Sequence, residues 1–164
     1  MAITIPPRNK IEKKYPWNAE SVFKSSKEWE AELQSILKDI PNVKKYQGNL
    51  GTSPETLLQA MQSIEALMKR VMHVYMFAAF SYNVDTTDQK ATAMLGKAQG
   101  MHGQVAGAVS YLNPELLQIG KATLDDWMIK NENLSIYRQS MQNLFRQQEH
   151  VRSSEVEELL GTLA

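Results

Sequence analysis

The stretch Arg146-Gln147-Gln148-Glu149-His150 comes close to a zinc-binding pattern without matching it. The inverted zinc-protease signature is a histidine, two residues, a glutamate and a second histidine, but here Arg146 occupies the first histidine position. Read forward from His150, the H-E-x-x-H pattern is also incomplete, because Val151 stands where the glutamate should be. A histidine at a helix C-terminus is favoured by the helix dipole, so we interpret this segment as a helix end followed by a turn.

The remaining residues that carry chemistry are scattered. His73, His102 and His150 fall on different predicted helices, and none has a second His, Asp or Glu three or four residues later. A transition-metal site needs three or four convergent ligands. No Ser-His-Asp order and no paired-carboxylate spacing stands out, and with no cysteine there is no thiolate. We therefore predict no catalytic residue, no cofactor-binding residue and no metal ligand in this chain.

Composition excludes several classes of partner. The 18 basic and 18 acidic residues cancel, so no broad charge footprint for nucleic acid exists. The one local basic cluster, which we interpret as a solvated N-terminal arm, consists of Arg8, Lys10, Lys13 and Lys14. The longest apolar run, around residues 71–80, is far short of the ~20 residues that a membrane span needs. The first ten residues contain two prolines and no apolar core of secretory length, which predicts no signal peptide.

Helical periodicity dominates the chain from residue 25 onward. Ser25 and Glu28 form a capping box, and the helix that they start is expected to stop at Pro41. Ser53-Pro54 starts a second helix of roughly 28 residues, because no breaker appears before Asn83. A third helix is predicted from about residue 87 to 112, ended by Asn113-Pro114.

Shorter helices complete the prediction: 113–120, capped by Asn113 and stopped by Gly120; 123–131; about 135–150; and a last one capped by Ser154. No strand is credible. The fold class is all-α, a multi-helix bundle with two long antiparallel helices and several shorter helices. We divide the chain into an N-terminal arm (1–24) and a helical domain (25–164).

Two details in the long helices indicate unusual packing. The segment VMHVYMFAAF (71–80) is apolar nearly all round, which is typical of a helix buried on all sides. The third helix has one apolar face, and nearly opposite it a glycine stripe formed by Gly96, Gly100, Gly103 and Gly107. Each interior glycine costs about 1 kcal/mol against alanine, so we expect contact on both faces of this helix. A surface for an extended ligand is the alternative reading of the stripe. The 9 methionines likewise favour core packing over a peptide-binding surface.

Five blocks resemble, in order, the N-terminal region of oligoendopeptidase F, a bacterial branch of the thimet-oligopeptidase-like zinc metallopeptidases: KKYPWNAESVFKSSKEWEAEL, YQGNL, YMFAAFSYNVDTTDQKATAMLGKAQ, YLNPELLQIG and YRQSMQNLFRQQEHVRSSEVEELL. The resemblance covers residues 14–160. Its most specific parts are Tyr15-Pro16-Trp17-Asn18, Pro114-Glu115-Leu116-Leu117 and the segment from Arg146 through His150 to Glu157. Gln148 and Val151 depart mildly from the pattern.

The resemblance implies a cytoplasmic enzyme that cuts oligopeptides, built as a bowl of helices around a deep channel. Its zinc would sit on an H-E-x-x-H helix in the C-terminal half of the enzyme, together with a further glutamate. This chain contains no H-E-x-x-H, so no catalytic residue is carried over and the chain alone should be inactive. The partners implied are the C-terminal catalytic domain and an oligopeptide substrate.

Two hypotheses remain open. The chain is the non-catalytic N-terminal domain or a fragment of such a peptidase, forming part of the channel wall, or it is a freestanding helical module that binds peptides or proteins. For a cut-out domain we expect a bare apolar patch, larger than is usual on a monomer. It should lie around Tyr75, Met76, Phe77 and Phe80, or along the glycine stripe, and be hidden in a homodimer. The alternative is a monomer in which the helices from residue 125 to 163 cover both faces.

Overall fold

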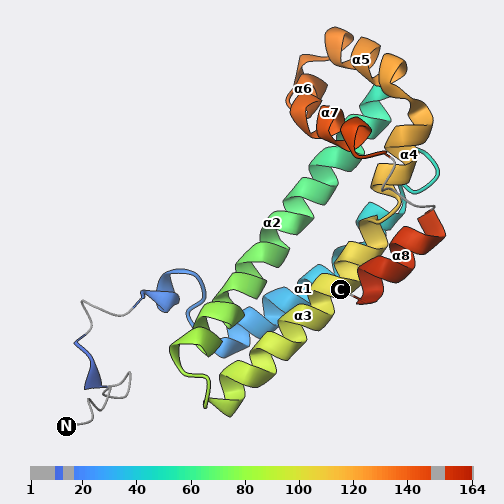
Figure 1. The fold of residues 1–164 in the computed structure, drawn as a ribbon. Helices are drawn as coiled ribbons and strands as arrows, with labels where there is room; N and C mark the ends of the chain where they lie inside the picture. The colour runs from blue at the N-terminus through green and yellow to red at the C-terminus, as the bar shows by residue number, and fades with distance from the viewer. Residues whose placement is uncertain (1–9, 13–16, 149–153, 164) are drawn as a thin grey trace.

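The computed structural model describes residues 10–12, 17–148 and 154–163, and within them the chain is helical without a strand. This confirms the all-α prediction (Figure 1). A short 3-10 helix at Ala19–Ser21 precedes the α-helices, which are α1 Ser26–Lys44, α2 Pro54–Val84, α3 Gln89–Val109, α4 Leu112–Ile119, α5 Lys121–Lys130, α6 Glu132–Ser135, α7 Arg138–Arg146 and α8 Ser154–Leu163.

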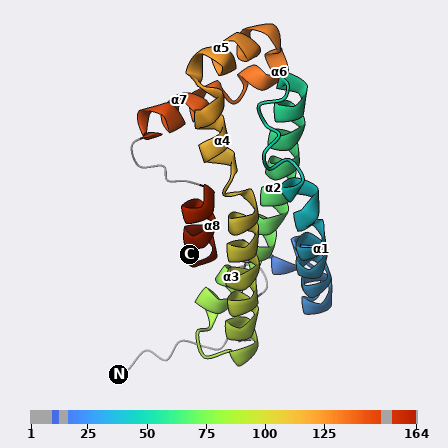
Figure 2. The same ribbon diagram turned by 90° about the vertical axis from the view of Figure 1, so that its right-hand side faces the viewer.

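Three long helices form the body of the molecule. A short turn makes α2 and α3 antiparallel neighbours, and α1 packs against both (Figures 1 and 2). Apolar residues spaced three or four apart on each helix meet in one core, as the periodicity of the sequence predicts. Its fully buried members include Trp29, Ile36, Leu57, Val71, Val74, Met101, Val105 and Tyr111.

The shorter helices occupy two separate places. Helices α4 to α7 gather at the N-terminal end of α2, where α6 contacts α2 and α7 contacts α4 (Figure 1). Gly120 separates α4 from α5 with a φ of 87°, a backbone conformation that favours glycine, so the predicted stop is confirmed. Helix α8 instead lies along α3 (Figure 2).

The predicted starts of the first two helices are confirmed in atomic detail. Ser25 Oγ accepts a hydrogen bond from the Glu28 N–H at 3.2 Å, and the Glu28 carboxylate accepts one from the Lys24 N–H at 2.8 Å. Ser53 Oγ accepts from the Thr56 N–H at 3.1 Å. These side chains satisfy N–H groups that the first helical turn leaves without partners.

Several predicted boundaries are wrong. Helix α1 runs through Pro41 to Lys44, because a proline this close to a helix end removes only one backbone bond, and its own carbonyl still accepts from the Lys45 N–H at 3.1 Å. Helix α3 ends at Val109, and α4 starts after Tyr111 without a side-chain cap, so Asn113 lies inside α4 and is not its cap.

The helix predicted from about residue 135 to 150 is instead two elements, α6 and α7, joined at 136–137. Asn131 caps α6 by accepting from the Leu134 N–H at 3.3 Å, and this local bond starts a helix earlier than the periodicity indicated. His150 lies outside the described residues. The cap predicted at Ser154 borders undescribed residues and stays a prediction.

Buried side-chain donors fix α1 against its neighbours. Trp29 Nε1 donates to the Val74 carbonyl of α2 at 2.9 Å, and the Tyr111 hydroxyl donates to the Val43 carbonyl at the end of α1 at 2.6 Å. Both side chains are only 1% exposed, so each polar atom needs this partner. Glu115 ties the loop after α1 to α4, because its carboxylate accepts from the N–H groups of Gly48 at 2.5 Å and Leu50 at 3.3 Å.

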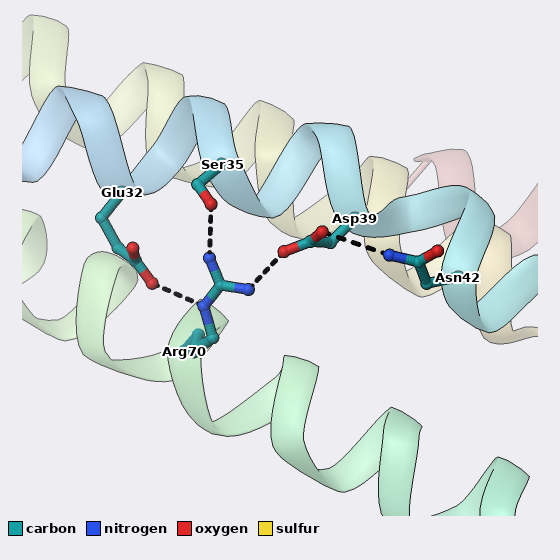
Figure 3. Close-up of polar contacts among 5 residues, drawn as sticks. All are labelled: Glu32, Ser35, Asp39, Asn42 and Arg70. Atoms are coloured by element: carbon teal, nitrogen blue, oxygen red, sulfur yellow. Dashed lines mark hydrogen bonds and ion pairs between the residues drawn. The ribbon is translucent and has the colours of Figure 1, made fainter.

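Arg70 of α2 reaches across to three side chains of α1 (Figure 3). Its guanidinium donates to Glu32 at 2.6 Å, to Asp39 at 2.5 Å and to Ser35 at 2.8 Å. The hydrogen bonds to the two carboxylates raise the pKa of Arg70 further above its ordinary value. The Arg70 side chain is one-third exposed, so solvent screens the attraction only in part.

We expect Arg70→Met to lower the free energy of unfolding by about 1–3 kcal/mol, because it leaves two carboxylates on α1 without their shared cation. Lys97→Met is the matched control, since it removes a single and more exposed ion pair to Glu30 and should cost under about 1 kcal/mol. Urea unfolding followed by circular dichroism measures both. Equal losses in the two variants would show that the Arg70 network contributes no more than a surface pair.

Candidate interaction surface

The outward face of α2 changes character halfway along the helix. In the first half, exposed positions carry Gln62, Glu65 and Lys69. In the second half, four exposed apolar residues follow at intervals of four: Met72, Met76, Phe80 and Val84, hereafter the α2 stripe. Their exposed fractions are 43%, 37%, 43% and 46%. The same side of one helix therefore passes from polar to apolar.

The α2 stripe lies on the side of α2 that faces away from α1 and α3, the long helices that pack along this half of α2. Val71, Val74 and Ala78 turn toward α1 and α3 and are fully buried, which leaves the opposite side uncovered. The expectation that residues 71–80 are buried on all sides is therefore wrong. An apolar circumference needs neighbours all round, and α4 to α7 gather at the other end of α2 (Figure 1).

Aromatic residues from before α1 cover part of the predicted patch. Phe77 is buried, with the Trp17 ring at 5.7 Å and the Phe23 ring at 5.2 Å. Phe80 remains 43% exposed although Trp17 meets it edge-on at 5.4 Å. Of the four residues expected in the patch, Met76 and Phe80 are exposed, Tyr75 is half-buried and Phe77 belongs to the core. The division into an arm and a domain at residue 24 stays a prediction.

The α2 stripe is smaller than the sequence analysis expected. At about 200 Å² for a large side chain, its four exposed fractions leave roughly 300 Å² of apolar surface. Patches of about 300–600 Å² are common on monomers and are often functional. The composition of the stripe, not its size, distinguishes it from the rest of α2.

A shallow groove borders the stripe where α2 meets α3. It is lined by Met72, Tyr75, Gln99 and His102, and the rings of Tyr75 and His102 lie 5.7 Å apart. His73 lies exposed on the neighbouring position of α2. Within residues 10–12, 17–148 and 154–163, no group of three or more His, Cys, Asp or Glu side chains is placed to hold a metal ion.

The glycine stripe of α3 is only partly explained. Helix α8 lies along α3 while α1 and α2 pack on it as well, so the predicted contact on more than one face is confirmed. A Cβ added at Gly96 or Gly100 would nevertheless meet no atom within 4 Å, and nothing in the structure explains glycine at these two positions.

The polar end of the α2 face makes an exposed hydrogen bond to the start of α7. The Tyr137 hydroxyl donates to the Glu65 carboxylate at 2.8 Å, which holds the start of α7 beside α2. Ile136, the preceding residue, is 70% exposed.

From Ala66 to Val84 the sequence contains no acidic residue, whereas Lys69 and His73 lie exposed beside the α2 stripe. Among the described helices, none combines the length and apolar character that crossing a membrane requires.

Comparison with known proteins gives concordant results. A family model described as Oligopeptidase F matches residues 115–164. The chain is 30% identical over 157 residues to Oligopeptidase PepF of Bacillus subtilis, covering 96% of this chain and 23% of that protein. It is 30% identical over 154 residues to Group B oligopeptidase PepB of Streptococcus agalactiae, covering 94% of this chain and 26% of that protein.

Two solved structures share the fold. The oligoendopeptidase-F of Enterococcus faecium superimposes with a TM-score of 0.77 at 23% identity, over 84% of this chain and 27% of its own. A putative peptidase of Chlamydophila abortus gives 0.78 at 21% identity, over 98% of this chain and 27% of its own. The chain thus spans about a quarter of the length of the proteins that it matches.

We expect Met76→Gln to change the free energy of unfolding by less than about 0.5 kcal/mol, because the stripe contributes little to this chain's own core. Phe77→Ala, one position away, should cost about 3–5 kcal/mol because it empties the aromatic cluster with Trp17 and Phe23. Thermal and urea unfolding of both variants measure this difference. A large loss in Met76→Gln would mean that the stripe is core and not surface.

Two tyrosines should ionise at a higher pH than a tyrosine in water. Burial, with the nearby charge of Glu115, raises the pKa of Tyr111 to about 12. Burial, with the hydrogen bond to Glu65, raises the pKa of Tyr137 to about 12. Both phenols favour the protonated form in the folded state, so their contribution to stability is complete below about pH 10 and is lost as pH rises toward 12.

Ultraviolet titration of phenolate should therefore show two tyrosines ionising near pH 12 in the folded chain. In urea, where the chain is unfolded, no tyrosine should ionise at so high a pH. Tyr137→Phe should remove one of the two. Ionisation of all six tyrosines near pH 10 without unfolding would contradict both assignments.

Proposed function

Because the chain corresponds to the N-terminal region of oligoendopeptidase F, we propose that it is the non-catalytic N-terminal helical domain of a zinc metallopeptidase that hydrolyses oligopeptides. The observation that carries the proposal is the end-to-end match. About 30% identity extends over 94–96% of this chain, and the same helical arrangement recurs in the solved peptidases.

The role of the domain in this proposal is structural. Helices α1 to α3 supply a rigid layer that forms part of the wall of the substrate channel, and an oligopeptide is the substrate of the whole enzyme. The described residues contain no set of side chains that fits zinc, and the sequence contains no H-E-x-x-H. We therefore place the zinc, and the water activation that it supplies, on other parts of the enzyme and derive no step of the reaction from this chain. A cytoplasmic location belongs to the same proposal.

The second candidate is a freestanding helical module that binds peptides or proteins without catalysis. The α2 stripe and the adjoining groove favour it, because they form an apolar surface that is exposed among the described residues. The homodimer expected in the sequence analysis stays untested, and sedimentation of the isolated chain decides between it and a monomer.

We expect the isolated chain to hold no stoichiometric zinc and to cleave no oligopeptide, because its described residues supply no convergent ligand set and its sequence lacks H-E-x-x-H. The protein encoded by the complete reading frame should hold zinc and lose its peptidase activity on chelation. Elemental analysis and a quenched-fluorescent oligopeptide assay on both preparations test this. One tightly held zinc in the isolated chain, lost together with activity on chelation, would overturn the assignment of roles.

A further inference from the structure

We propose that the α2 stripe is the contact face through which this domain packs against the remainder of the same peptidase chain. The inference rests on the proposed function and adds the place at which the two parts meet. The stripe is the exposed row formed by Met72, Met76, Phe80 and Val84.

The first step is the internal contrast along α2. The helix is continuous over 31 residues, so both halves of its outward face have the same geometry. Where the face carries Gln62, Glu65 and Lys69 it has the composition of a surface in water. Where it carries the stripe, the composition is that of a helix face in contact with protein. The change within one helix indicates that a second body covers the C-terminal half.

The second step is the size of that body. The stripe offers roughly 300 Å², whereas a stable interface buries about 800 Å² on each partner. Two stripes packed against each other would therefore not supply enough surface for a stable homodimer. A small apolar centre surrounded by polar residues is instead the anatomy of a larger contact, and Lys69, His73 and Asn83 provide such a rim.

The third step is the identity of the partner. In the two solved relatives this fold makes up 27% of the chain, so about three times as much chain is linked to it within one polypeptide. A covalently linked partner also needs less intrinsic affinity, because the linkage sets a high effective concentration. Its matching surface should be apolar opposite the stripe and carry a carboxylate opposite Lys69, which lies exposed beside the methionine end of the stripe.

The absence of cysteine from this sequence gives a direct test. Met76→Cys places one thiol in the centre of the stripe, and Lys38→Cys places one at an exposed position of α1 as the matched control. Each variant is prepared as the isolated chain and within the complete reading frame, with any cysteine elsewhere replaced. Maleimide labelling rates are compared between the two preparations, after circular dichroism confirms that they are folded.

We expect labelling at position 76 to be at least tenfold slower in the complete protein than in the isolated chain, and labelling at position 38 to change less than about twofold. Equal rates at position 76 in a complete protein that holds zinc and cleaves peptides would overturn the contact face and leave the proposed function intact. A complete protein without zinc and peptidase activity would instead overturn the proposed function.

Sedimentation of the isolated chain tests whether a second copy of this chain covers the α2 stripe instead. We expect a monomer at micromolar concentration. A dimer that Met76→Glu dissociates, with Lys38→Glu as the control that leaves it intact, would assign the stripe to a second copy of this chain and overturn the proposal.

Discussion

The length of α2 is the constraint on which the rest of the structure depends. Its 31 residues span about 46 Å, whereas the 19 residues of α1 and the 21 of α3 span about 28 and 32 Å. Neither α1 nor α3 is long enough to cover α2 along its whole length. The surplus lies at the N-terminal end, and α4 to α7 gather there, with Tyr137 bonded to Glu65 (Figure 1). Helices α4 to α7 therefore gather at this end because α2 is longer than α1 and α3, which pack along the rest of it.

Helix α1 sets the register of the other two long helices through side-chain donors and ion pairs. On the α2 side, Trp29 bonds Val74 and Arg70 bonds both Glu32 and Asp39, the pairing expected for antiparallel helices. On the α3 side, Glu30 pairs with Lys97, and the Val43 carbonyl pairs with Tyr111. The two partners of each pair are separated by nearly the same number of residues, which is the pattern expected for parallel helices. Buried donors aimed at backbone carbonyls fix position along a helix more sharply than apolar packing does, because a carbonyl cannot change rotamer.

Local signals in the sequence predicted local structure well. The Ser25 and Ser53 caps and the Gly120 stop were correct because the atoms that form them lie within four residues of each other. The continuation of α1 through Pro41 was not predictable in this way, since a proline ends a helix only where the lost hydrogen bond and the ring clash outweigh the packing around it. The α2 stripe was anticipated in place but not in detail. Hydropathy along residues 71–80 cannot tell which side α1 and α3 cover, nor that Trp17 and Phe23 fold onto Phe77.

The residues in the α2 stripe also bear on how its contact works. Methionine is unbranched and polarisable, so Met72 and Met76 adapt to a partner surface without requiring a unique fit. Phe80 is different, because its ring meets Trp17 edge-on while 43% of the residue remains exposed. A partner that packs on Phe80 would therefore touch a residue already held by the segment before α1. The position of that segment and the shape of the contact face are then linked through the Trp17–Phe80 pair, whereas the methionine end of the stripe can adjust to a partner.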